Sequence, residues 1–197
     1  MSFARFKSPF RMVVLCSVAV LTVCLAGCAT SGNQKIHTAS GVPEQRFSMV
    51  GSGLQTTALI TKDGAQGPSV NLGRFDEGRA IRGTVNNFPL DIRVSGTRAE
   101  GQWGSGPINV NVDETGNQLT MNGLVAGRPS TWTASLEAIQ GNIGFCAYDL
   151  RRAGNDYVGS RSCGRGIGNV TVEFPSTILE WQPINIAVLM ALLMSTP

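Results

Sequence analysis

The stretch Gly83-Thr-Val-Asn-Asn-Phe-Pro-Leu-Asp-Ile-Arg-Val94 decides the fold, because a similar pattern follows it twice. The two copies are Gly101-Gln-Trp-Gly-Ser-Gly-Pro-Ile-Asn-Val-Asn-Val112 and, more weakly, Gly123-Leu-Val-Ala-Gly-Arg-Pro-Ser-Thr-Trp-Thr-Ala134. In each unit a glycine precedes a proline by six residues. Apolar and polar residues alternate after the proline, less strictly in the third unit. A period of two is typical of a half-buried antiparallel strand. Each unit therefore predicts a β-hairpin whose returning strand starts at the proline, where one missing backbone donor is tolerated.

The units follow one another after 18 and then 22 residues, which is too short for an intervening helix. Consecutive hairpins predict an up-and-down meander. Similar alternation predicts further strands at 57–61 and 70–75, joined as a hairpin across 63–68, and at 145–151, 157–163 and 170–174. The fold class expected is all-β, an antiparallel β-meander of about ten strands, barrel-like or folded as a sandwich, with a short C-terminal helix. Closure would remove strand edges that invite aggregation.

The C-terminal segment, about 176–195, changes character after Pro175. A short turn is expected over 177–181, and Pro183 at a first helical position starts a helix over 184–194. This helix is apolar on nearly every side, with Asn185 the exception, and is too short to span a bilayer. We expect it to be buried against the apolar face of the sheet or over an open barrel end. The alternative is a helix that binds a partner or dips into a membrane.

The N-terminus has the order of a secretory signal: the basic residues Arg5, Lys7 and Arg11, an apolar run over 12–25, and two small residues. The motif Leu25-Ala26-Gly27-Cys28 that ends it resembles the lipobox of bacterial lipoproteins. That resemblance implies removal of residues 1–27 and lipidation of Cys28, and Ala29 in place of an aspartate implies the outer membrane. Two or three acyl chains hold a protein stably on a membrane. The alternative is an ordinary signal peptide with a chance cysteine.

The expected domains are the signal peptide 1–27, a lipidated flexible tether 28–46, and a single β-rich domain 47–197. The tether is small and polar without an apolar period. The whole chain has 16 basic and 13 acidic residues, and loss of the signal removes three basic ones, so the mature part is formally neutral. Its charge therefore gives no support for nucleic-acid binding.

Two cysteines remain as thiols once Cys16 and Cys24 leave with the signal and Cys28 is acylated. An even pair in an oxidising compartment predicts a disulfide between Cys146 and Cys163. The alternative, a redox or catalytic thiol, lacks both C-x-x-C spacing and a nearby histidine.

Catalytic motifs are scarce. The single histidine, His37, lies in the expected tether, and no G-x-S-x-G, P-loop or H-E-x-x-H motif occurs. We therefore predict no catalytic, metal or cofactor-binding residue. Carboxylates are the remaining candidate catalysts, since glycosidases need only two about 5 to 10 Å apart, but their positions are outward or in turns. They are Asp91, Glu100, Asp149, Asp156 and Glu173.

The three tryptophans, Trp103, Trp132 and Trp181, offer flat aromatic surfaces of the kind that line carbohydrate or lipid pockets. Trp103 and Trp132 fall on the apolar face of their expected strands, which indicates core packing. The hypothesis for function is a membrane-anchored envelope lipoprotein that binds or scaffolds without enzymatic activity. Its partners would be the membrane, through the lipid on Cys28, and a protein or an apolar ligand inside the sheet. The alternatives are a carboxylate-dependent hydrolase of envelope polysaccharide and a protein that docks into an envelope complex through its C-terminal helix.

Overall fold

The fold is that of a computed structural model, which describes residues 45–51, 53–164 and 166–195. The signal peptide, Cys28, His37 and nearly all of the expected tether lie outside these residues. Within the described residues, fourteen strands, two short 3-10 turns and one α-helix follow in chain order. They are β1 Arg46–Gly51, β2 Leu54–Thr61, β3 Gly64–Gly67, β4 Val70–Phe75, η2 Asp76–Gly78, β5 Ala80–Val85, β6 Phe88–Ser95, β7 Arg98–Trp103, β8 Gly106–Thr115, β9 Gln118–Val125, β10 Arg128–Ser135, β11 Ala138–Ile143, β12 Cys146–Ala153, β13 Asp156–Ser162, β14 Ile167–Glu173, η3 Ser176–Glu180 and α1 Pro183–Met194.

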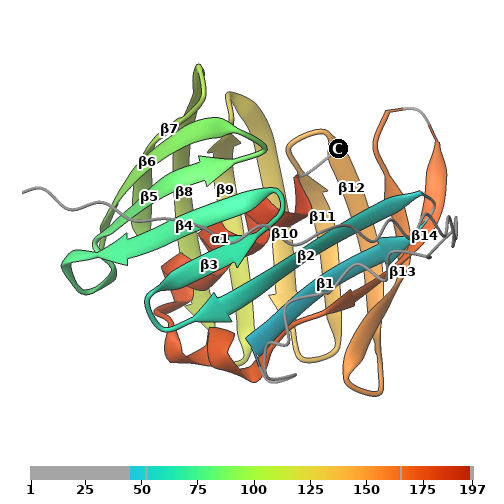
Figure 1. Ribbon diagram of the computed structural model, residues 1–197. Coiled ribbons are helices and arrows are strands. Elements are labelled where there is room, and N and C mark those ends of the chain that lie inside the picture. Colours follow the sequence, from blue (N-terminus) through green and yellow to red (C-terminus); the bar gives the residue numbers. More distant parts are fainter. Residues whose placement is uncertain (1–44, 52, 165, 196–197) are drawn as a thin grey trace, which may run out of the picture. The chain divides into compact units, whose positions relative to one another are not determined.

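The strands form one closed barrel in which every strand pairs antiparallel with its neighbours in sequence (Figure 1). The ring closes where β1 pairs with β14, with Met49 opposite Val172. An all-β antiparallel meander with a C-terminal helix is thus confirmed, and of the two expected architectures the barrel is the one formed. The expected number of about ten strands was too low, because several short strands carry little apolar alternation.

One hairpin expectation is wrong in its pairing. Residues 57–61 and 70–75 do not pair, because Gly64–Gly67 between them forms the strand β3, which pairs with β2 on one side and β4 on the other. The sequence Gly-Ala-Gln-Gly has almost no side chain to show a period of two, so its strand character comes from backbone pairing alone.

The three repeat units form the hairpins β5–β6, β7–β8 and β9–β10, as predicted. Each has a two-residue turn, and Asn86 and Asn87 take φ of 51° and 65°, the left-handed geometry that tight hairpin turns require. The prolines occupy the second position of the returning strand, one residue later than expected.

Glycines at matching positions extend the repeat beyond the three units. One lies in each of β5, β7, β9, β11 and β13, where an added Cβ would come within 2.0 to 2.3 Å of a carbonyl oxygen on the preceding strand. These residues are Gly83, Gly101, Gly123, Gly141 and Gly159. Such glycines let neighbouring backbones approach closely and let a sheet bend sharply. Their regular recurrence explains how strands this short curve into a ring.

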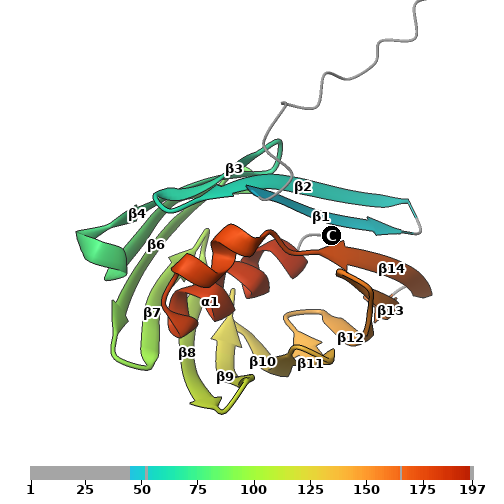
Figure 2. The ribbon, with the colours of Figure 1, turned by 90° about the horizontal axis from the view of Figure 1, so that it is seen from below.

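The barrel is apolar inside and polar outside. Along β6 the inward Leu90, Ile92 and Val94 are buried, and the alternating Asp91 and Arg93 are exposed. Helix α1 lies inside the ring of strands (Figure 2). Ten of its twelve residues are buried, and all of these except Asn185 join the inward side chains in one apolar core. Burial of α1 agrees with the expected packing on the apolar face, and it contradicts a helix free to dock a partner or dip into a membrane.

Candidate ligand-binding site

An apolar pocket of about 280 Å³ lies beside α1 at the barrel end that holds η3, and we call it the η3-end pocket. The helix makes its main contacts with β7, β8 and β9, and its residues Pro183, Ile186 and Met190 line the pocket. Its walls come from the β8–β9 hairpin, β10, β11, β13, Phe174 directly after β14, η3 and α1. The side chains are mostly apolar, among them Leu119, Ile139, Phe174, Ile178, Ile186 and Met190. An apolar concavity of this kind suits an apolar ligand.

Two aromatic rings form one wall of this pocket. Tyr157 and Phe174 meet edge to face with ring centroids 6.0 Å apart, and Phe174 also packs on Phe47 at 5.3 Å. The Tyr157 hydroxyl donates a hydrogen bond to the Ser135 carbonyl oxygen over 2.7 Å. Burial raises the pKa of Tyr157, so the phenol is neutral at physiological pH. This wall is therefore uncharged, and its one polar atom already has a partner.

The rim of the η3-end pocket exposes two leucines. Leu179 on η3 is 76% exposed and Leu136 in the β10–β11 turn is 53% exposed, and both line the pocket. The only ionisable lining side chains within the described residues are Glu114 and Tyr157. The apolar surface of the pocket thus continues to exposed side chains at its rim.

A second pocket, of about 380 Å³, lies at the opposite end of α1, and we call it the turn-tip pocket. Residues of the β5–β6, β7–β8, β9–β10 and β11–β12 turns line it together with Ser195, which follows α1. Phe88 and Phe145 are exposed there, and Arg128 places its guanidinium over the Phe145 ring. The pocket is thus aromatic and carries one cation.

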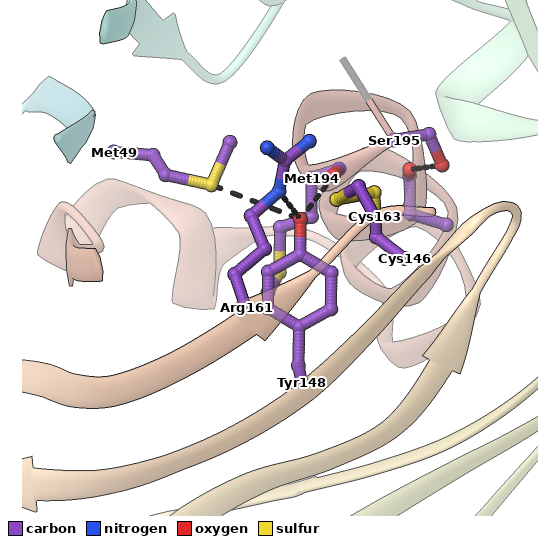
Figure 3. Close-up of a disulfide and its surroundings, with 8 residues drawn as sticks. Met49, Cys146, Tyr148, Arg161, Cys163, Met194 and Ser195 are labelled. Atoms are coloured by element: carbon purple, nitrogen blue, oxygen red, sulfur yellow. Dashed lines mark hydrogen bonds between the residues drawn. A yellow bond between two sulfur atoms is a disulfide. The ribbon is translucent and has the colours of Figure 1, made fainter. Parts of the chain in front are cut away.

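The C-terminal end of α1 is fastened to the barrel wall by a buried tyrosine (Figure 3). Tyr148 on β12 donates its hydroxyl proton to the Met194 carbonyl oxygen, and Arg161 Nε donates to the Tyr148 hydroxyl over 2.8 Å. Desolvation raises the pKa of Tyr148 and outweighs the opposing effect of Arg161. The contact satisfies a helix carbonyl that has no partner inside the helix.

The predicted disulfide is confirmed. Cys146, the first residue of β12, is joined to Cys163, which directly follows β13, and their Cα atoms are 4.2 Å apart. Cys146 is buried in the core close to Tyr148 (Figure 3). The disulfide therefore links β12 to the end of β13 close to the hydrogen bond between Tyr148 and the end of α1.

The carboxylates considered as catalysts lie on the outside of the barrel. Each of three has an arginine within 4 Å; the pairs are Asp91 with Arg82, Glu100 with Arg98 and Asp149 with Arg151. Asp156 and Glu173 are directly opposite each other on β13 and β14, and Ser48 donates a hydrogen bond to Glu173 over 3.3 Å. Neither member of this pair lines an end pocket. Across the part of the chain that the structure describes, no three His, Cys, Asp or Glu side chains gather as metal ligands.

The tryptophans divide between core and pocket. Trp132 and Trp181 are buried, which confirms core packing for Trp132. Trp103 packs on the edge of the core and also lines the turn-tip pocket, where its indole N–H donates to the Val85 carbonyl oxygen over 3.1 Å. Sequence reasoning missed Phe88 and Arg128, although each directly precedes a repeat proline. Equivalent repeat positions meet at one barrel end, and this is the signal that could have found them.

No family model, curated protein or solved structure matches the chain. Among the residues that the structure describes, none of the helices combines the length and apolar character needed to cross a membrane.

Proposed function

We propose that this chain is a lipid-anchored envelope lipoprotein that binds a small apolar ligand, without catalysis, in the η3-end pocket. The observation that carries the proposal is the continuity between the apolar pocket and the exposed Leu136 and Leu179 at its rim. A ligand that covers these leucines removes apolar surface from water on both partners, worth about 0.8 kcal/mol for each methylene group buried.

The chemistry of the lining supports an uncharged apolar ligand segment. The Tyr157 hydroxyl is occupied by Ser135, so it offers its ring rather than a free donor. Glu114 is exposed at the pocket and disfavours an anionic group beside it, because like charges repel. A neutral amphiphile such as a long-chain alcohol fits these conditions.

The proposed location is the cell envelope, with the outer membrane as the expected site and the lipid on Cys28 as the membrane contact. The lipobox supports the anchor, and the Cys146–Cys163 disulfide supports an oxidising compartment. Mass spectrometry of the protein purified from membranes tests this placement: an N-terminal Cys28 with acyl mass is expected. An intact leader, or an unmodified residue 28, would refute it.

The ligand proposal is tested by photolabelling the purified full-length protein with a long-chain alcohol that carries a diazirine. Label is expected on peptides covering 176–190, and Leu179→Gln is expected to reduce it several-fold. Ile167→Gln is the matched control, because Ile167 is 79% exposed, as Leu179 nearly is, but lies outside the pocket. Label spread over the outer surface, or equal loss in both variants, would refute the proposal.

A second candidate is a carboxylate-dependent hydrolase of envelope polysaccharide, favoured by one observation. Asp156 and Glu173 face each other on adjacent strands, a placement that sets Cβ atoms about 5 Å apart. Side chains on Cβ atoms this close can bring their carboxyl groups to about 5 Å, the carboxyl separation that retaining glycosidases use. Glycan cleavage that is lost in Asp156→Asn with Glu173→Gln, and kept in Asp91→Asn, would establish the hydrolase over the pure binder.

A further inference from the structure

The turn-tip pocket differs in chemistry from the η3-end pocket and lies at the other end of α1. We propose that the turn-tip pocket is a separate binding site for a saccharide that carries a carboxylate or a phosphate. The sugar ring would lie on the exposed phenylalanines, and the anionic group would bind Arg128.

The aromatic side chains form an open platform. Phe88 is 59% exposed and Phe145 is 63% exposed, and Trp103 lies half-buried beside them. The Phe88 ring packs on the turn at Gly104, where a Cβ added to the glycine would lie 3.3 Å from the ring. Burying a phenylalanine side chain contributes about 2 kcal/mol of free energy, which an exposed ring does not gain. Two exposed aromatic rings lining one pocket therefore indicate a ligand that stacks on them.

The Arg128 guanidinium can bind an anion. Its guanidinium lies over the Phe145 ring, and within the described residues it has no carboxylate partner and no side-chain hydrogen bond. Arg82 makes an instructive contrast, because it also lies over a phenylalanine but is paired with Asp91. With one face of Arg128 on the ring, its N–H edges are left for a carboxylate or phosphate, which the planar fork binds through two hydrogen bonds.

The remaining lining favours a sugar over an apolar anion. Asn86, Ser105 and Ser195 add polar atoms among the aromatic rings, which matches a ligand with an apolar face and hydroxyl groups at its edge. The end of α1 at Ser195 carries the negative end of the helix dipole, so it disfavours the anionic group there and leaves it to Arg128. A purely apolar ligand would bury Arg128 without a partner, which is costly.

Calorimetry on the purified full-length protein, in micelles of a detergent without sugar, tests the site with glucuronate, glucose 6-phosphate and glucose. The two anionic sugars are expected to bind with a Kd of about 1 mM or tighter, and glucose at least tenfold more weakly. Arg128→Gln is expected to weaken the anionic sugars at least tenfold, and Phe145→Leu to weaken all three. Arg82→Gln, the matched control, is expected to change nothing.

Three results would overturn the site: no anionic sugar bound at up to about 10 mM, binding unchanged by Arg128→Gln, or inorganic phosphate bound as tightly as glucose 6-phosphate. The last result would mean that the rings contribute nothing. Leu179→Gln is expected to leave sugar binding intact, so failure of the η3-end pocket and failure of this site are measured separately.

Discussion

Gly123→Ala tests the idea that close-approach glycines bend the barrel wall. Gly123 lies near the end of β9, and an added Cβ would stand 2.1 Å from the Asn109 carbonyl oxygen and 2.7 Å from the Val110 Cα. Because real Cβ contacts stay beyond 3.0 Å, β8 and β9 must separate by about an ångström, against the close packing of the core. Overpacking of this kind costs about 1 to 3 kcal/mol. The Gly123 φ of 146° adds about 1 kcal/mol of strain for alanine.

The expected total is a loss of about 2 to 4 kcal/mol in the free energy of unfolding. Gly154→Ala is the matched control, because Gly154 also has a positive φ, 68°, but its added Cβ would meet nothing within 4 Å. It should lose only about 1 kcal/mol, from backbone strain. In thermal unfolding followed by circular dichroism, the Tm is expected to fall by about 4 to 16 °C for Gly123→Ala and about 2 to 4 °C for Gly154→Ala.

The reasoning is refuted if the two variants lose the same stability, because then only backbone strain matters and the contact with Asn109 does not. Gly101→Ala provides a second measurement, since its Cβ would lie 2.0 Å from the Asp91 carbonyl oxygen without a positive φ. A large loss in that variant isolates the steric contribution.

Three further predictions concern α1 and its fastening. Leu192→Ala removes a side chain that is 1% exposed, and denaturant unfolding should show a loss of about 2 to 5 kcal/mol, whereas a loss under 1 kcal/mol would argue against a packed helix. Replacing Cys146 and Cys163 together by serine should lower the free energy of unfolding by about 3 kcal/mol, because the disulfide closes a loop with a sequence separation of 17. A reducing agent should destabilise the unsubstituted protein but not this variant. Burial raises the pKa of Tyr148, so just above pH 10 the phenol keeps its proton in the native state and loses it in the unfolded chain. The buried neutral phenol therefore contributes fully to the free energy of unfolding below pH 10, and this contribution is lost as the pH rises through the higher native pKa. In titrations from pH 9 to pH 12, Tyr148→Phe should therefore show a smaller alkaline decline in stability than the unsubstituted protein, and equal slopes would contradict this.

The candidate sites were only partly readable from the sequence. The expectation of an apolar ligand inside the sheet named no residues, because the side chains that line the η3-end pocket come from elements between β8 and α1 and are far apart in the chain. The sequence analysis considered Trp103, which lines the turn-tip pocket. Phe88 and Arg128 belong to different repeat units and line the same pocket only because the strand register from β6 to β10 aligns their turns.

The sequence by itself determined the strands of the repeat, their hairpin pairing, the disulfide partners and the position of the helix. These features depend on local signals: alternation with a period of two, turn residues, cysteine count and a proline at a helix start. The tertiary structure alone decided that β1 meets β14, that β3 is a strand, and that α1 lies inside the ring. Those outcomes depend on how sharply the wall bends and on what fills the space it encloses, and both are set by contacts between residues distant in the chain.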